Sequence, residues 1–118
     1  MSPDDLFKGR PESRRIYEAV VRVIASVGRA TIRTSKSQIA FRRKTGFAFV
    51  WIPGIYLRHN DVPLVLTIAF RRYNASPRWK QVVEPRPGRF THHIELRSTK
   101  DVDGQVVLWL KEAWQAAA

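Results

Sequence analysis

Apolar residues recur at helical spacing near the start of the chain. Ile16, Val20 and Ile24 follow one another every four residues, and charged side chains fill many of the positions between them. Pro11 suits a first helical turn, and Gly28 suits the end of a helix. This pattern predicts an amphipathic helix over residues 11–27 whose apolar stripe needs a sheet to cover.

A second apolar stripe lies close to the C-terminus. Ser98 followed three residues later by Asp101 is typical of a helix start, either as a capping-box pair or with Asp101 alone as the cap. We therefore expect a helix that runs almost to the C-terminus. Its stripe comprises Val102, Val106, Trp109, Leu110 and Ala113.

Between the two helices the pattern changes to short runs rich in β-branched and aromatic residues. They predict strands over 30–35, 39–43, 47–51, 62–70 and 90–96, while residues 78–83 fit a short helical turn or an extended segment. Strands grouped between helices favour an α+β fold. We expect a two-layer sandwich, with an antiparallel sheet of about five strands and both helices on one face. Residues 1–118 would form one domain, of which residues 1–9 would be flexible.

Residues 37–51 predict a hairpin whose loop ends at Gly46, because glycine accepts positive φ without steric cost. If Arg43 faces Phe47 across the turn, every position on the two strands is assigned to a face. The pattern leaves open which face the helices cover. One face carries Ile39, Phe41, Arg43, Phe47, Phe49 and Trp51, and the other carries Gln38, Ala40, Arg42, Ala48, Val50 and Ile52.

The chain has a net charge of +11, and this charge is unevenly spread. Residues 29–97 hold fourteen basic and three acidic side chains, so the excess belongs to the predicted sheet and its loops. Such segregation favours nucleic acid or an acidic protein surface as partner, although a solvated basic surface is the alternative. No apolar run approaches the roughly 18 residues of a membrane span, so we expect a cytoplasmic protein without membrane contact.

Cationic and aromatic residues are interspersed in this basic region, and nucleic-acid binders use both kinds. Cations offset phosphate charge, while aromatic rings stack on unpaired bases. The candidate polyanion-binding residues are Lys36, Arg42, Arg43, Arg58, Arg71, Arg78, Lys80 and Arg89, within a wider set that includes Arg72 and Arg86. The candidate aromatic platform is Phe47, Phe49, Trp51 and Trp79, although aromatic residues at alternating positions are more often core.

His92 and His93 are adjacent on a predicted strand and so point to opposite faces, which argues against a shared metal ion. His92 shares its face with apolar neighbours and is expected to be a hydrogen-bonded core residue. His93 shares a face with Glu95, and the two are weak candidates for a catalytic acid/base pair. The chain has no cysteine and no cofactor-binding motif, so we expect neither a metal nor a cofactor.

Two segments carry a resemblance to a known family: KSQIAFRRKTGFAFVW at residues 36–51 and SPRWKQVVEPRPGRFTHHIEL at residues 76–96. With the C-terminal helix, they resemble a family of small bacterial proteins described only as a domain of unknown function. The resemblance spans about Leu6 to Ala117 and implies no activity. The element order is also similar to frataxin-like α-β-α sandwiches, but their acidic iron-binding helix has no counterpart here.

Three hypotheses for function follow. The first is a non-enzymatic domain that holds nucleic acid or another polyanion on a basic sheet face. The second is a protein-interaction module or a homodimer formed through the open sheet face or an edge strand. The third is an enzyme or small-anion pocket built from His93, Glu95, Lys36, Trp79 and Lys80.

Overall fold

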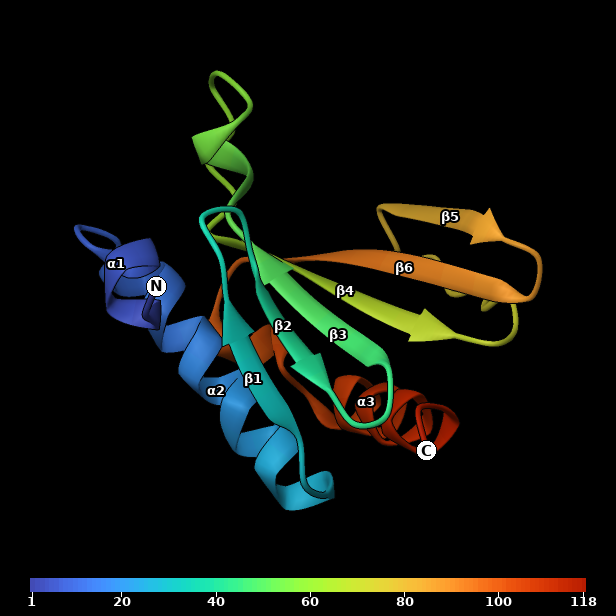
Figure 1. Ribbon diagram of the computed structural model, residues 1–118. Coiled ribbons are helices and arrows are strands. Elements are labelled where there is room, and N and C mark those ends of the chain that lie inside the picture. The colour runs from blue at the N-terminus through green and yellow to red at the C-terminus, as the bar shows by residue number, and fades with distance from the viewer.

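The computed structural model describes residues 1–118 as an antiparallel sheet with helices on one of its faces (Figure 1). The helices are α1 (Pro3–Phe7), α2 (Pro11–Val27) and α3 (Gly104–Ala116), with 3₁₀ turns η1 (Pro53–Ile55) and η2 (Thr99–Asp101). The strands are β1 (Thr31–Thr34), β2 (Ile39–Arg42), β3 (Gly46–Trp51), β4 (Leu64–Phe70), β5 (Gln81–Arg86) and β6 (Arg89–Leu96). Their order in the sheet is β1-β2-β3-β4-β6-β5. The predicted α+β architecture is confirmed, with six strands rather than five.

Helix α2 begins at Pro11, where the missing backbone N–H costs nothing, and ends before Gly28. Its stripe of Ile16, Val20 and Ile24 is buried against the sheet and α3. No helix in the chain combines the length and apolarity needed to cross a membrane.

Helix α3 starts later than the sequence pattern predicted. The Ser98–Asp101 pair does form a capping box, but it caps η2. The side chain of Asp103 accepts a hydrogen bond from the backbone N–H of Val106 and so caps α3 itself. The predicted stripe on α3 is otherwise present, with Val106, Trp109, Leu110 and Ala113 buried.

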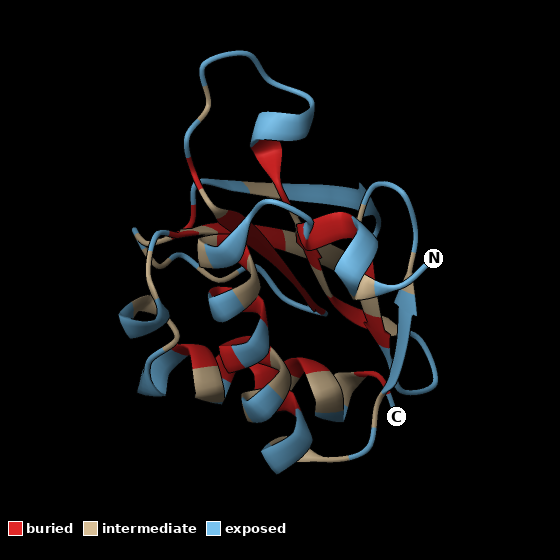
Figure 2. Ribbon diagram, turned by 90° about the vertical axis from the view of Figure 1, so that its left-hand side faces the viewer, coloured by how far each residue is buried: buried red, intermediate tan, exposed pale blue.

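The core lies between the helices and the covered face of the sheet, as the burial colours in Figure 2 show. All seven residues of β4 are buried, because this strand has neighbours on both sides and side chains over both faces. His92 is fully buried in this core, and its Nε2 accepts a hydrogen bond of 2.9 Å from the backbone N–H of Asn74. Its expected role as a hydrogen-bonded core histidine agrees with this position.

The predicted hairpin register between residues 37 and 51 is wrong by one residue. Phe47 has no partner on β2, because a bulge interrupts the pairing beside it. Phe47 is buried in the core, whereas Phe49 and Trp51 lie on the face opposite Phe41. The covered face therefore mixes residues from both predicted faces. The observed pairs are Ile39 with Val50, Ala40 with Phe49, Phe41 with Ala48 and Arg42 with Gly46.

Two segments differ from their predicted conformation. Residues 81–86 form the edge strand β5, although a helical turn was one of the two predictions for this region. Residues 1–9, which were expected to be flexible, include helix α1, where Leu6 and Phe7 are buried. The ring of Phe7 packs 4.9 Å from that of Tyr17 on α2, which anchors the N-terminal segment to the helix layer.

Candidate nucleic-acid interface

The surface of the uncovered sheet face is recessed along β4. Val65, Thr67 and Ala69 point to this face and are only 5–6% exposed. Their short side chains lie below longer ones from the neighbouring strands β3 and β6. The result is a shallow hollow of about 280 Å³, here called the aromatic hollow. It is lined by Gln38, Phe49, Trp51, Thr67, Arg89, Thr91 and His93.

A hydrogen-bonded row crosses the floor of the aromatic hollow. Trp51 Nε1 donates to Thr67 Oγ1 at 3.2 Å, and Thr67 Oγ1 lies 2.7 Å from His93 Nδ1. An indole N–H can only donate, so the Thr67 oxygen accepts from Trp51. Thr67 then shares a second hydrogen bond with Nδ1 of His93. Burial lowers the pKa of His93, which keeps the ring neutral at pH 7.

A second hollow of about 340 Å³ adjoins the first at the end of the sheet formed by the β2–β3 and β5–β6 turns. Three of its six lining residues are arginines. We call it the arginine hollow; it is lined by Arg42, Thr45, Gly46, Pro85, Arg86 and Arg89.

Arg89 lies where the two hollows meet, because it lines both of them. Its Nη2 donates to the backbone carbonyl of Gly46 at 3.1 Å. Since β4 lies between β6 and β3, the Arg89 side chain must cross the end of β4 to make this bond. Burial, with a smaller contribution from the charge of Arg86, lowers the pKa of Arg89. Burial and the charge of Arg86 both disfavour the charged form of Arg89, so an anion that enters the hollow stabilises this cation.

The charges of the arginine hollow are not neutralised within the chain. Five arginines elsewhere form ion pairs with carboxylates, but Arg42, Arg86 and Arg89 have no carboxylate within 4.0 Å. The side chains of Arg42 and Arg86 make no hydrogen bond in the structure and are exposed. Three cations therefore converge on one space with no internal counter-charge.

The remaining predicted cations lie outside the arginine hollow. Arg71 is the nearest, because it lines a cleft of about 220 Å³ that also includes Arg86 and Arg89. Lys36 lies in the β1–β2 turn and Arg58 in the β3–β4 loop, at the opposite end of the sheet (Figure 1). Lys80 is exposed at the start of the edge strand β5. The open face thus gathers only part of the predicted cationic set.

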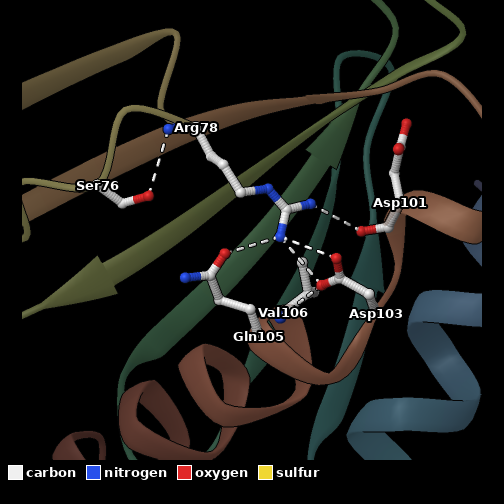
Figure 3. A network of polar contacts seen from close by, with 6 residues as sticks. All are labelled: Ser76, Arg78, Asp101, Asp103, Gln105 and Val106. Atoms are coloured by element: carbon white, nitrogen blue, oxygen red, sulfur yellow. Dashed lines mark hydrogen bonds and ion pairs between the residues drawn. The ribbon is translucent and has the colours of Figure 1, made fainter.

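Arg78 is occupied by contacts within the fold, contrary to its predicted place in a polyanion site (Figure 3). Its Nη1 donates to both carboxylate oxygens of Asp103 at 3.0 Å and to Gln105 Oε1 at 2.9 Å. Its Nη2 donates to the backbone carbonyl of Asp101 at 3.2 Å. These bonds tie the segment before β5 to the start of α3. Arg43 is likewise held against the ring of Trp114.

Two of the four predicted platform residues are buried and cannot serve as a platform. Phe47 belongs to the core, as described above. Trp79 lies on the helix-covered side, where its ring packs 4.2 Å from that of Trp109 and its Nε1 donates to Asn74 Oδ1 at 3.0 Å. Because the hydrophobic effect favours burial of these rings in the core, they are not available to stack on a ligand. Phe49 and Trp51 remain partly exposed beside the aromatic hollow.

The weak catalytic candidates His93 and Glu95 share the uncovered face but do not contact each other. His93 Nδ1 bonds to Thr67, while Glu95 lies 3.7 Å from the guanidinium of Arg97. Lys36 and Trp79, proposed for the same pocket, lie at other places in the fold. Nowhere in the chain do three His, Asp or Glu side chains come together in a group that could hold a metal ion.

Sequence reasoning did not single out Thr67. The signal was present, since Thr67 is the one hydroxyl-bearing residue in the apolar run 62–70. A polar group in the middle of a central strand requires a partner. Here it has two, Trp51 and His93, and all three converge on the same hollow.

Comparison with known proteins places the chain in a family. The family described as domain of unknown function (DUF5655) matches residues 3–117. This chain belongs to DUF5655. The match agrees with the resemblance drawn from residues 36–51 and 76–96. No curated protein and no solved structure matches this DUF5655 chain, so its similarity to frataxin-like element order stays an analogy.

Proposed function

We propose that the uncovered face of this DUF5655 domain binds nucleic acid or another polyanion without acting on it chemically. One observation carries the proposal: Arg42, Arg86 and Arg89 converge on one hollow, and none of their guanidinium groups has a carboxylate within 4.0 Å. Guanidinium groups donate paired hydrogen bonds to phosphate oxygens in a fork geometry that lysine lacks. An entering phosphate would relieve the mutual repulsion of the three charges.

The proposal is tested by measuring the affinity for fluorescently labelled oligonucleotides at low ionic strength. The double variant Arg42→Gln, Arg86→Gln removes two charges from the arginine hollow without breaking any hydrogen bond in the fold. The matched control Arg22→Gln, Lys111→Gln removes two exposed charges from the helix layer. The proposal predicts that the first variant loses most of its affinity and the control little. No binding by the wild-type protein, or equal losses in both variants, would refute it.

The β1 edge favours a second function, association with another copy of the chain. All four residues of β1 are exposed or partly exposed, and no strand covers its outer edge. An unpaired edge is a template for a further strand. Pairing of two β1 edges would extend the sheet and leave the hollows open, whereas face-to-face association would bury Trp51. The mass of the protein in solution, measured with and without oligonucleotide, separates these cases.

A further inference from the structure

We propose that the ligand is single-stranded nucleic acid, with phosphates in the arginine hollow and one unpaired base in the aromatic hollow. This inference rests on the proposed function and narrows it to one class of ligand. It depends on the chemistry of the aromatic hollow and on the continuity of the two hollows.

The aromatic hollow is lined by aromatic rings and also by hydrogen-bonding groups. Phe49 and Trp51 are partly exposed at its wall. The side-chain amide of Gln38 makes no hydrogen bond within the chain, and Nε2 of His93 is also without a partner. A planar heterocycle with donors and acceptors on its edge fits this combination, because bases stack on aromatic side chains and are read by amide and imidazole groups.

The Trp51–Thr67–His93 row prepares the aromatic hollow for a ring. Trp51 is fixed through its Nε1, and its ring meets that of His93 edge-to-face, at 85° with centroids 6.4 Å apart. A base that stacks on Trp51 therefore finds a side chain that is already ordered. Binding then costs less conformational entropy than it would on a mobile surface side chain.

The two hollows form one path across the sheet. Arg89 lines both, and it lies on the same strand as His93, four residues before it. The rise of a strand separates their backbones by about 13 Å. A strand of several nucleotides brings successive phosphates to the three arginines while one base lies in the aromatic hollow, whereas a nucleoside monophosphate brings only one phosphate.

A double helix does not fit the aromatic hollow, because its bases are paired and stacked inside the duplex. The volume of about 280 Å³ lies just below the range of about 300–1,000 Å³ for small-molecule pockets, which suits one ring system. The positively charged end of the sheet still attracts duplex phosphates. The two ligands should therefore differ in affinity, and only the single strand should depend on Trp51.

The test uses the full chain, an unstructured labelled oligonucleotide of about ten nucleotides and the matching blunt duplex. Trp51→Leu removes both the ring and the bond to Thr67, whereas Trp51→Phe removes the bond and keeps a ring face. We expect Trp51→Leu to weaken single-strand binding by about 5- to 150-fold, the usual range for one stacked base. Trp51→Phe should keep most of the affinity, and neither variant should change duplex binding.

The outcomes separate this inference from the proposed function. If single strand and duplex bind equally and Trp51→Leu matches the wild type, while Arg42→Gln, Arg86→Gln loses both, the base site is wrong and polyanion binding stands. If nothing binds at low ionic strength, both proposals fail. If a mononucleotide competes as well as the oligonucleotide at equal phosphate concentration, the ligand is a small nucleotide and the strand proposal is overturned.

Discussion

The guanidinium of Arg43 lies over a ring of Trp114, with its central carbon 3.6 Å from the ring centroid. Arg43 Nη1 also donates to the backbone carbonyl of Trp114 at 3.2 Å. Arg42, the preceding residue, lines the arginine hollow and contacts no acidic group. Two adjacent arginines thus have different roles: Arg43 fastens the β2–β3 turn to α3, and Arg42 is left free for a ligand.

This difference predicts separate effects of two neighbouring substitutions. Arg43→Gln should lower the free energy of unfolding by about 0.5–1 kcal/mol, the usual worth of an exposed cation–π contact, and leave oligonucleotide affinity close to that of other single-charge variants. Arg42→Gln should lower the affinity for the oligonucleotide and leave the free energy of unfolding unchanged. Thermal unfolding and fluorescence anisotropy on the same two proteins check the prediction, which fails if both variants lose stability and affinity in parallel.

Arg78→Gln should destabilise the fold without affecting binding, because Arg78 joins the segment before β5 to the start of α3 (Figure 3). The charges are partly exposed and screened by solvent, so we expect a loss of about 1 kcal/mol in the free energy of unfolding. Arg97→Gln is the control, since its ion pairs with Asp61 and Glu95 are long, at 3.7 Å, and should contribute almost nothing. Equal stabilities of the two variants in urea would contradict this role for Arg78.

Mild acid should destabilise the protein before most of its carboxylates titrate. Burial lowers the pKa of both His92 and His93, so the unfolded chain takes up protons on these residues near pH 6.5 while the native state resists protonation. The stability from neutral histidines is fully present above about pH 6.5 and is lost as the pH falls below it. Urea unfolding at pH 7 and pH 5 measures the loss, which His93→Gln should reduce. A stability that is unchanged or higher at pH 5 would rule out this linkage.

Gly28→Ala should destabilise the junction between α2 and β1. A Cβ atom at Gly28 would overlap with Cζ2 of Trp114, whose Nε1 donates to the carbonyl of Arg29 at 2.8 Å. Overpacking of this kind costs about 1–3 kcal/mol. Gly104→Ala is the matched control, because nothing lies within 4 Å of the added atom and alanine favours the helix there. A calorimetric midpoint lowered equally by both changes would show that the Trp114 contact is unimportant.

The architecture was predictable because the spacing of apolar residues along the sequence indicates which side chains are buried. The stripes containing Ile16 and Trp109, and the apolar run of β4, each fit only one kind of element. Capping residues were harder to place: Ser98 and Asp101 cap a 3₁₀ turn, and Asp103 caps α3. A capping pattern indicates the start of a turn without specifying how many turns follow.

The candidate site could not be predicted in full, because one bulge decides it. The sequence 37–51 alternates well in either register, and only tertiary packing selects the one that buries Phe47 and exposes Phe49 and Trp51. The approach of Arg42, Arg86 and Arg89 depends on two turns that are remote in sequence. Composition shows that the excess positive charge lies in residues 29–97, but pairing with carboxylates, which removes Arg78 from the site, is visible only in three dimensions.

The central claim is that the arginine hollow neutralises phosphate, and the salt dependence of binding tests it most directly. For three phosphate contacts on a single strand, the logarithm of the association constant should fall against the logarithm of salt concentration with a slope of about −2. Arg42→Gln, Arg86→Gln should reduce this slope to about −0.7, while Arg22→Gln, Lys111→Gln should leave it near −2. The same slope in all three proteins, or a wild-type affinity that does not depend on salt, would contradict the account.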